Sequence, residues 1–192
     1  MGIQCYSLVY SGDFKLGIYA CIDSDWTSNP EDQKLQTGYF LMIVGSAFSW
    51  TLRTQKTVAL SSTKAEYMAL SDCSHQCVWI HSILTELGYR FRPIHISEDN
   101  QGSIFISSNP VTESRNKYID VCFHAIWDFV TQRKVKLFFI EENENPASMF
   151  TKNLSHVKFC KFRAQLSLIF HWMEKTLYHV QLSLTGIEPC TK

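Results

Sequence analysis

Three acidic residues in this sequence could form a metal-binding cluster. Asp23 closes the apolar part of LGIYACIDSDW, and Asp99 closes that of PIHISEDN. Glu66 lies four residues before Leu70, which places its carboxylate on the apolar stripe of a long amphipathic segment. Hard divalent cations prefer oxygen ligands, and a buried carboxylate needs a partner because an unpaired buried charge is costly. The three residues therefore predict a divalent-metal carboxylate cluster.

Each acid also has an ordinary structural interpretation. Glu66 could close a capping box with Thr63, the residue at which we expect the helix to begin. Asp99 could cap the helix that follows it, and Asp23 could end a strand in the turn D-S-D. The cluster is favoured because all three acids lie at the ends of predicted elements.

The elements that must position these acids follow from hydrophobic periodicity. Apolar runs bounded by turn residues predict strands, and apolar residues at three- and four-residue steps predict helices. The predicted strands are 16–26, 37–45, 47–54, 93–100 and 135–142, and the predicted helices run from Thr63 to Gly88, through Ile104 and Ile106, over 118–132 and onward from near Pro146. This order implies an α/β fold with a mixed five-stranded sheet flanked by helices.

Composition limits the functional classes. The chain has 192 residues, 45% of them hydrophobic, which suits one domain with extensions. A formal net charge of +0 argues mildly against a dedicated nucleic-acid binder. The seven cysteines include no C-x-x-C pair and indicate reduced thiols. We see neither a signal peptide nor a membrane span, so we expect an intracellular protein (cytoplasm or nucleus) that is not secreted.

Seven sequence blocks, in order, resemble the ribonuclease H region of copia-type LTR-retrotransposon (retrovirus-related) Pol polyproteins. The blocks are LVYSGDFKLGIYACIDSDW, TGYFLMIVGSAFSW, QKTVALSSTKAEYMALSDC, VWIHSILTELG, SEDNQGSIFISSNPV, SRNKYIDV and FTKNLS. SSTKAEYMAL is the most diagnostic, because the family has SSTEAEYMAL. The resemblance covers 8–168 and implies a ribonuclease H-like domain over 16–168. Residues 1–15 would then be an extension left from the link to reverse transcriptase, and 169–192 an extension of unknown role.

The resemblance implies an enzyme that hydrolyses the RNA strand of RNA–DNA hybrids during reverse transcription. Asp23, Glu66 and Asp99 match the catalytic and metal-binding acids, which would hold two Mg²⁺ ions, with Mn²⁺ as an alternative. Two ions about 4 Å apart would let one activate a water while the other stabilises the leaving oxygen. The implied partners are the hybrid and the reverse transcriptase and integrase regions of the parent polyprotein, which this chain lacks. No membrane partner is implied.

One family position has changed. The family's ADILTK supplies a fourth carboxylate, whereas this chain reads ASMFTK and has Ser148 there. Serine cannot offset cationic charge as a carboxylate does. Glu141, Glu142 and Glu144 are close enough in sequence for one of them to compensate. We therefore expect a degenerate fragment with weakened activity.

Substrate contacts are predicted at five polar residues near the ends of the elements. They could meet sugar and phosphate groups, including the RNA 2′-OH, although they could equally be solvated loop residues. The five are Gln55, Lys56, Ser61, Asn100 and Gln101. Three tryptophans, Trp26, Trp50 and Trp79, are expected in the core.

Alternatives from other classes stay open. The chain could be a catalytically inactive ribonuclease H-fold remnant that at most binds nucleic acid, or a fragment that folds poorly. An integrase, or another nuclease of the same superfamily, fits the SSTKAEYMAL block less well.

Overall fold

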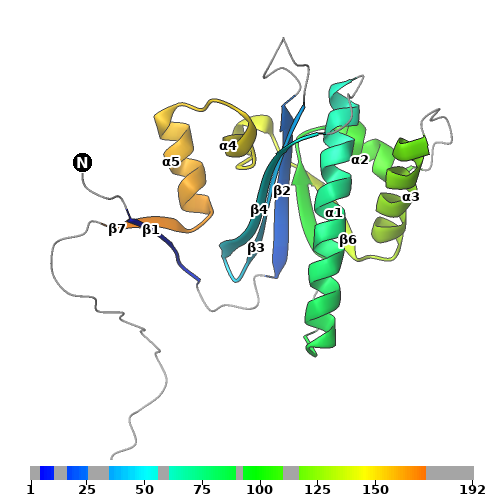
Figure 1. The fold of residues 1–192 in the computed structure, drawn as a ribbon, viewed down its shortest axis with the longest axis horizontal. Coiled ribbons are helices and arrows are strands. Elements are labelled where there is room, and N and C mark those ends of the chain that lie inside the picture. The colour runs from blue at the N-terminus through cyan, green and yellow to red at the C-terminus, as the bar shows by residue number, and fades with distance from the viewer. Residues whose placement is uncertain are drawn as a thin grey trace, which may run out of the picture.

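The fold is built on a mixed β-sheet of five strands (Figure 1). The computed structural model of the chain describes residues 5–10, 17–25, 35–55, 61–89, 93–109 and 117–171. The strands are β2 (Ile18–Asp25), β3 (Gln36–Ile43), β4 (Ser46–Thr54), β5 (Ile94–Glu98) and β6 (Val135–Phe139), in the spatial order β4-β3-β2-β5-β6. The predicted five-stranded sheet is therefore confirmed.

The sheet combines a meander with parallel strands. Strands β2, β3 and β4 pair antiparallel, whereas β5 pairs parallel with β2 and with β6. A two-residue turn at Val44 and Gly45 joins β3 to β4, and both residues have positive φ, 54° and 79°. Such turns match the twist of a hairpin. The sequence placed the break one residue later, at Gly45 and Ser46.

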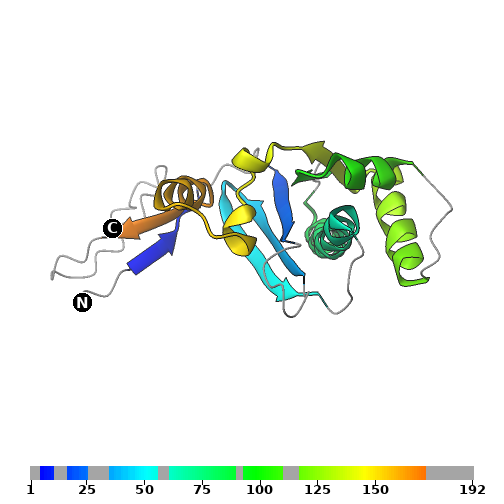
Figure 2. The same ribbon diagram turned by 90° about the horizontal axis from the view of Figure 1, so that it is seen from above.

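Helices cover both faces of the sheet (Figure 2). On one face lies α1 (Ser62–Glu86), accompanied by α2 (Gln101–Ser108) and α3 (Lys117–Thr131). Side chains of α1 pack with β2 and β5 in the main core, which includes Leu70, Ile22 and Ile96. The other face carries α4 (Ser148–Thr151), and α5 (His156–Gln165) follows. The sequence predicted one helix from Pro146, but extended backbone at Lys152 ends α4 and a new cap at Ser155 begins α5.

A separate two-stranded ribbon lies beyond α5. It pairs β1 (Cys5–Leu8) with β7 (Leu168–His171) in antiparallel register. Ser167 Oγ donates to Gly45 O at 2.6 Å, and Ala47 N donates to Leu166 O at 3.2 Å, so the ribbon is anchored at the β3–β4 turn. The sequence analysis did not predict these strands. Strand β1 falls inside the expected N-terminal extension, and β7 crosses the expected C-terminal boundary of the domain at residue 168.

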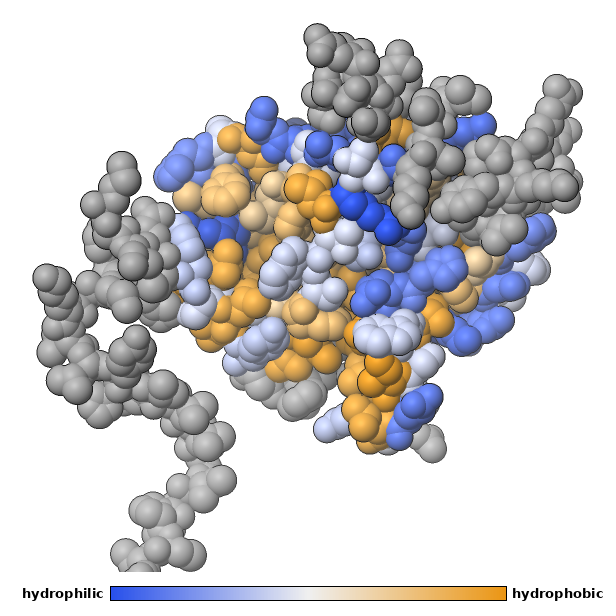
Figure 3. All heavy atoms as spheres, viewed as in Figure 1, coloured by the Kyte–Doolittle hydropathy of each residue, from blue (hydrophilic) through white to orange (hydrophobic). Residues whose placement is uncertain are grey.

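Two local predictions were wrong. Helix α1 is capped by Ser61, whose hydroxyl accepts from Lys64 N at 3.3 Å, so Thr63 does not form a capping box with Glu66. Trp50 and Trp79 are each 56% exposed and lie outside the core. Trp50 is on the edge strand β4, and Figure 3 shows apolar side chains at the surface of the molecule. Trp26 lies outside the described residues.

Gly38 allows α4 to pack directly on β3. A Cβ atom at this position would lie 2.8 Å from both Phe150 Cβ and Thr151 Cγ2. We expect Gly38→Ala to lower the free energy of unfolding by about 1–3 kcal/mol, because α4 must move to relieve the overlap. Urea denaturation followed by circular dichroism measures this loss. An unchanged unfolding midpoint would contradict the tight contact.

Candidate metal centre

The three predicted acids meet at one end of the sheet. Asp23 lies near the end of β2, Asp99 directly follows β5, and Glu66 lies in the second turn of α1. Because β2 and β5 are parallel neighbours, their carboxyl ends share one edge. One carboxylate oxygen from each acid lies within 4.8 Å of the other two. The juxtaposition predicted from the sequence is therefore present in the structure.

Protein donors hold one oxygen of each buried acid. Glu66, 6% exposed, accepts a hydrogen bond from Ser24 N to Oε1 at 3.1 Å. Asp23, 0% exposed, accepts a hydrogen bond from the Thr151 hydroxyl to Oδ2. Within the described residues, buried Glu66 Oε2 has no hydrogen-bond partner. These bonds orient the carboxylates and leave an oxygen of Glu66 for a ligand.

Asn145 ties the acids to the backbone. Its side chain, fully buried, donates to Ile22 O at 2.7 Å and lies 3.5 Å from Asp99 Oδ2. Its Oδ1 accepts from Ala147 N at 3.1 Å, just before α4. Sequence reasoning missed Asn145, because nothing local in the chain signals a contact with β2.

Lys152 is a second residue that the sequence analysis did not assign. Its ammonium lies 3.1 Å from Asp23 Oδ1 and 2.9 Å from Glu142 Oε1. Burial acts to lower the pKa of Lys152, but the Asp23 and Glu142 carboxylates more than offset this and raise it. Lys152 therefore stays protonated beside the cluster.

Burial and crowding raise the pKa values of Glu66, Asp99 and Glu98. Burial raises the pKa of Glu66 well above its ordinary value, and the charges of Asp23 and Asp99 raise it further. The pKa of Asp99 is also raised, by burial first and then by Asp23. Burial raises the pKa of the adjacent Glu98 to about 8. Without a cation, Glu66 and Asp99 therefore favour the protonated form more than ordinary carboxyl groups do.

The donor set fits a hard divalent cation. All three groups offer carboxylate oxygens, which Mg²⁺ and Mn²⁺ accept, and a bound cation would relieve the repulsion among them. The orphaned Glu66 Oε2 supports the fit, because a buried polar atom normally has a partner.

The position of the expected fourth carboxylate is buried. Ser148 is 0% exposed, and among the described residues its hydroxyl has no hydrogen-bond partner. Of the three neighbouring glutamates, Glu142 pairs with Lys152 and Glu144 with Lys161. Glu141 is exposed and directly precedes the 3-10 turn Glu142–Glu144.

The predicted substrate contacts have different environments. Gln55 is buried, and its amide nitrogen donates to Thr37 Oγ1 at 2.8 Å and to Ala65 O at 3.0 Å. Ser61 and Asn100 cap α1 and α2, respectively. Lys56 lies outside the described residues. Contact of these residues with a substrate stays a prediction.

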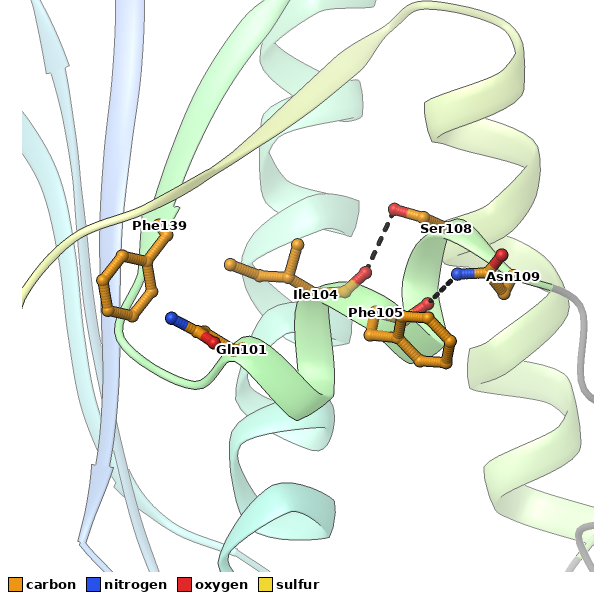
Figure 4. A pocket seen from close by; sticks show the side chains of 6 residues that line it. All are labelled: Gln101, Ile104, Phe105, Ser108, Asn109 and Phe139. Carbon is orange, nitrogen blue, oxygen red and sulfur yellow. Dashed lines mark hydrogen bonds between the residues drawn. The ribbon is translucent and has the colours of Figure 1, made fainter.

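Gln101 borders an apolar depression between α2 and Phe139 (Figure 4). The depression has a volume of about 350 Å³ and is lined by Gln101, Ile104, Phe105, Ser108, Asn109 and Phe139. The Ser108 hydroxyl and the Asn109 amide donate to carbonyls of α2 itself, at 3.0 and 2.9 Å. The depression is therefore largely apolar apart from Gln101.

Comparisons with known proteins show which proteins the chain resembles. No family model matches the chain. It is 38% identical over 141 residues to the retrovirus-related Pol polyprotein from transposon TNT 1-94 of Nicotiana tabacum, covering 72% of this chain and 11% of that protein. It is 34% identical over 154 residues to the polyprotein from transposon RE1 of Arabidopsis thaliana, covering 80% of this chain and 10% of that protein. The chain thus spans about a tenth of these relatives.

A solved structure shares the fold. The ribonuclease H1 named LC11, isolated from compost, superposes with a TM-score of 0.50 at 14% identity, covering 70% of this chain and 91% of that one. The fold is therefore that of ribonuclease H. The chain is thus homologous to one segment of the retrovirus-related Pol polyproteins from transposons. None of the helices that the structure describes contains an apolar stretch of membrane-spanning length.

The raised pKa of Glu98 predicts a pH-dependent stability. Between its ordinary value of 4.5 and about 8, the folded protein keeps a proton that the unfolded chain has released. The folded state then binds more protons, so stability falls as pH rises through this window. In EDTA, we expect the melting temperature to fall as pH rises through this window. Glu98→Gln should make the melting temperature depend less on pH, because an amide does not titrate.

The matched control is Glu86→Gln at the exposed end of α1. Thermal denaturation at several pH values compares the three proteins. If the melting temperature of Glu98→Gln falls with pH as steeply as that of Glu86→Gln, then another group causes the pH dependence.

Proposed function

We propose that this chain is a divalent-metal-dependent ribonuclease H-type endonuclease that hydrolyses the RNA strand of RNA–DNA hybrids during reverse transcription of a copia-type retrotransposon. The supporting observation is the approach of Asp23, Glu66 and Asp99 to within 4.8 Å at the carboxyl ends of β2 and β5. The family relationship supports the same reaction.

The chain's own residues would hold and orient the site. Asp23, Glu66 and Asp99 would bind two Mg²⁺ ions, or Mn²⁺ in their place, and the metal supplies Lewis acidity and a lowered pKa of bound water. The Thr151 hydroxyl fixes Asp23, and the backbone N–H of Ser24 fixes Glu66. Such contacts preserve ligand geometry, which is why partners of metal ligands affect metal affinity.

Weakened activity is part of the proposal. Ser148 brings a hydroxyl where the family has a carboxylate, which leaves less negative charge to hold two cations. This substitution favours a second candidate function, an inactive ribonuclease H-fold remnant that at most binds nucleic acid. The two candidates differ in whether a bound hybrid is cut.

The remaining assignments belong to the same proposal. The domain would span 16–168, with extensions at 1–15 and 169–192, and would act with the reverse transcriptase and integrase regions of a parent polyprotein in the cytoplasm or nucleus. Asn100 and Gln101 follow Asp99 directly and are the best placed of the predicted substrate contacts. Gln55, Lys56 and Ser61 are proposed only as further contacts at the start of α1.

Hybrid cleavage tests the function. We expect the purified protein to cut the RNA strand of a labelled RNA–DNA hybrid in Mg²⁺ or Mn²⁺, slowly, and Asp99→Asn to reduce the rate by at least about 100-fold, because a metal ligand is weakened. Gel electrophoresis of the products measures the rate. Glu86→Gln, on the exposed end of α1, is the control.

Binding and melting measurements separate the alternatives. A cooperatively melting protein that binds the hybrid without cutting it would support the inactive remnant. Cleavage that survives Asp99→Asn unchanged would place the activity elsewhere, or in a contaminant.

A further inference from the structure

Glu142 lies next to the metal centre through a shared ammonium. Lys152 Nζ is 2.9 Å from Glu142 Oε1 and 3.1 Å from Asp23 Oδ1. The distance between Glu142 Oε1 and Asp23 Oδ1 is therefore no larger than the sum of these two distances. A cation with its water ligands can bridge oxygens at that separation, because Mg²⁺ commonly keeps several waters and contacts some carboxylates through them.

The backbone that carries Glu142 is fixed beside the cluster. Glu142 begins the 3-10 turn Glu142–Glu144, and its carbonyl accepts from Asn145 N at 3.3 Å. The side chain of Asn145 in turn bonds Ile22 O and lies 3.5 Å from Asp99 Oδ2. The Glu142 side chain itself is 68% exposed.

The neighbouring glutamates are placed differently. Glu144 pairs with Lys161 on α5, with oxygen–nitrogen distances of 2.8 and 2.6 Å. Glu142, by contrast, shares the Lys152 ammonium with Asp23, one of the three acids of the metal centre. Glu142 is thus the glutamate of this turn that shares a counter-ion with the metal centre.

A second observation indicates that the centre is built for a cation. Glu66 Oε2 is buried and, among the described residues, accepts no hydrogen bond, and the Glu66 side chain is only 6% exposed. Ser148, at the family's fourth position, offers a hydroxyl that is also without a partner in the described part of the chain. Because the family has a carboxylate at this position, the chain lacks one acidic group at the start of α4.

We propose that Glu142 supplies the fourth carboxylate of the metal centre in place of Ser148, and that Lys152 holds it beside Asp23 until a divalent cation binds. This inference rests on the metal centre of the proposed function. It assigns the compensating role to one of the three glutamates near Ser148.

Manganese binding to the purified protein tests the assignment without relying on activity. In isothermal titration calorimetry we expect Glu142→Gln to weaken Mn²⁺ binding by about 10-fold or more. Glu144→Gln is the matched control, since it removes the same charge from the same turn but from a pair that faces α5, and it should change the affinity less than about 2-fold. Both side chains are exposed, so folding should be retained, and melting curves check this.

A double-mutant cycle gives the sharper result. In a Ser148→Asp background the fourth carboxylate is restored, so Glu142→Gln should then weaken Mn²⁺ binding by less than about 3-fold. An equal loss in both backgrounds would assign Glu142 a general electrostatic role and overturn the proposal.

The remaining outcomes distinguish the two proposals. If wild type binds Mn²⁺, Asp99→Asn abolishes binding and Glu142→Gln has no effect, then Glu142 is not a ligand and the metal centre stands. If wild type binds no Mn²⁺, the metal centre and the role of Glu142 fall together.

Discussion

The structure depends on one electrostatic constraint, the crowding of buried carboxylates at the end of a sheet. Asp23 and Glu98 are fully buried, Glu66 nearly so, and Asp99 is half-buried beside them. Such groups need protons, a cationic side chain or a metal ion, since unpaired charges in this environment are costly. The raised pKa values of Glu66 and Asp99 and the contact of Lys152 with Asp23 are two responses to the same constraint. Both are available to the protein before any ligand arrives.

Strand pairing, hydrogen bonds and close packing position the acids. Asp23 is held on the central strand, between an antiparallel and a parallel neighbour. Helix α4 lies close enough to β3 for Thr151 to reach Asp23, which requires a glycine at position 38. Asn145 then joins the strand ends to the start of α4. The residues of the metal centre and their partners therefore lie in or next to four elements that are distant in sequence, namely β2, α1, β5 and α4.

The parts that could be predicted from sequence have local signals. Apolar runs marked all five strands, and the stripe through Leu70 placed Glu66 toward the sheet. Asn145 and Thr151 had no such signal, because they contact residues 123 and 128 positions away. Periodicity likewise could not choose between Ser61 and Thr63 as the cap. The exposure of Trp50 depends on β4 being an edge strand, and the β1–β7 pairing joins distant segments, so both required the tertiary structure.

The β1–β7 ribbon has a mechanical consequence. Cys5 pairs with His171 at one end of the ladder and Leu8 with Leu168 at the other, nearest the β3–β4 turn. Tension applied between residues 5 and 171 would open the ladder one pair at a time, as a zipper opens, rather than shear all its hydrogen bonds together. The two strands of the ribbon would thus separate at low force, and their separation would account for the first extension of the chain. The load would reach the strand that carries Asp23 only after the ribbon had parted.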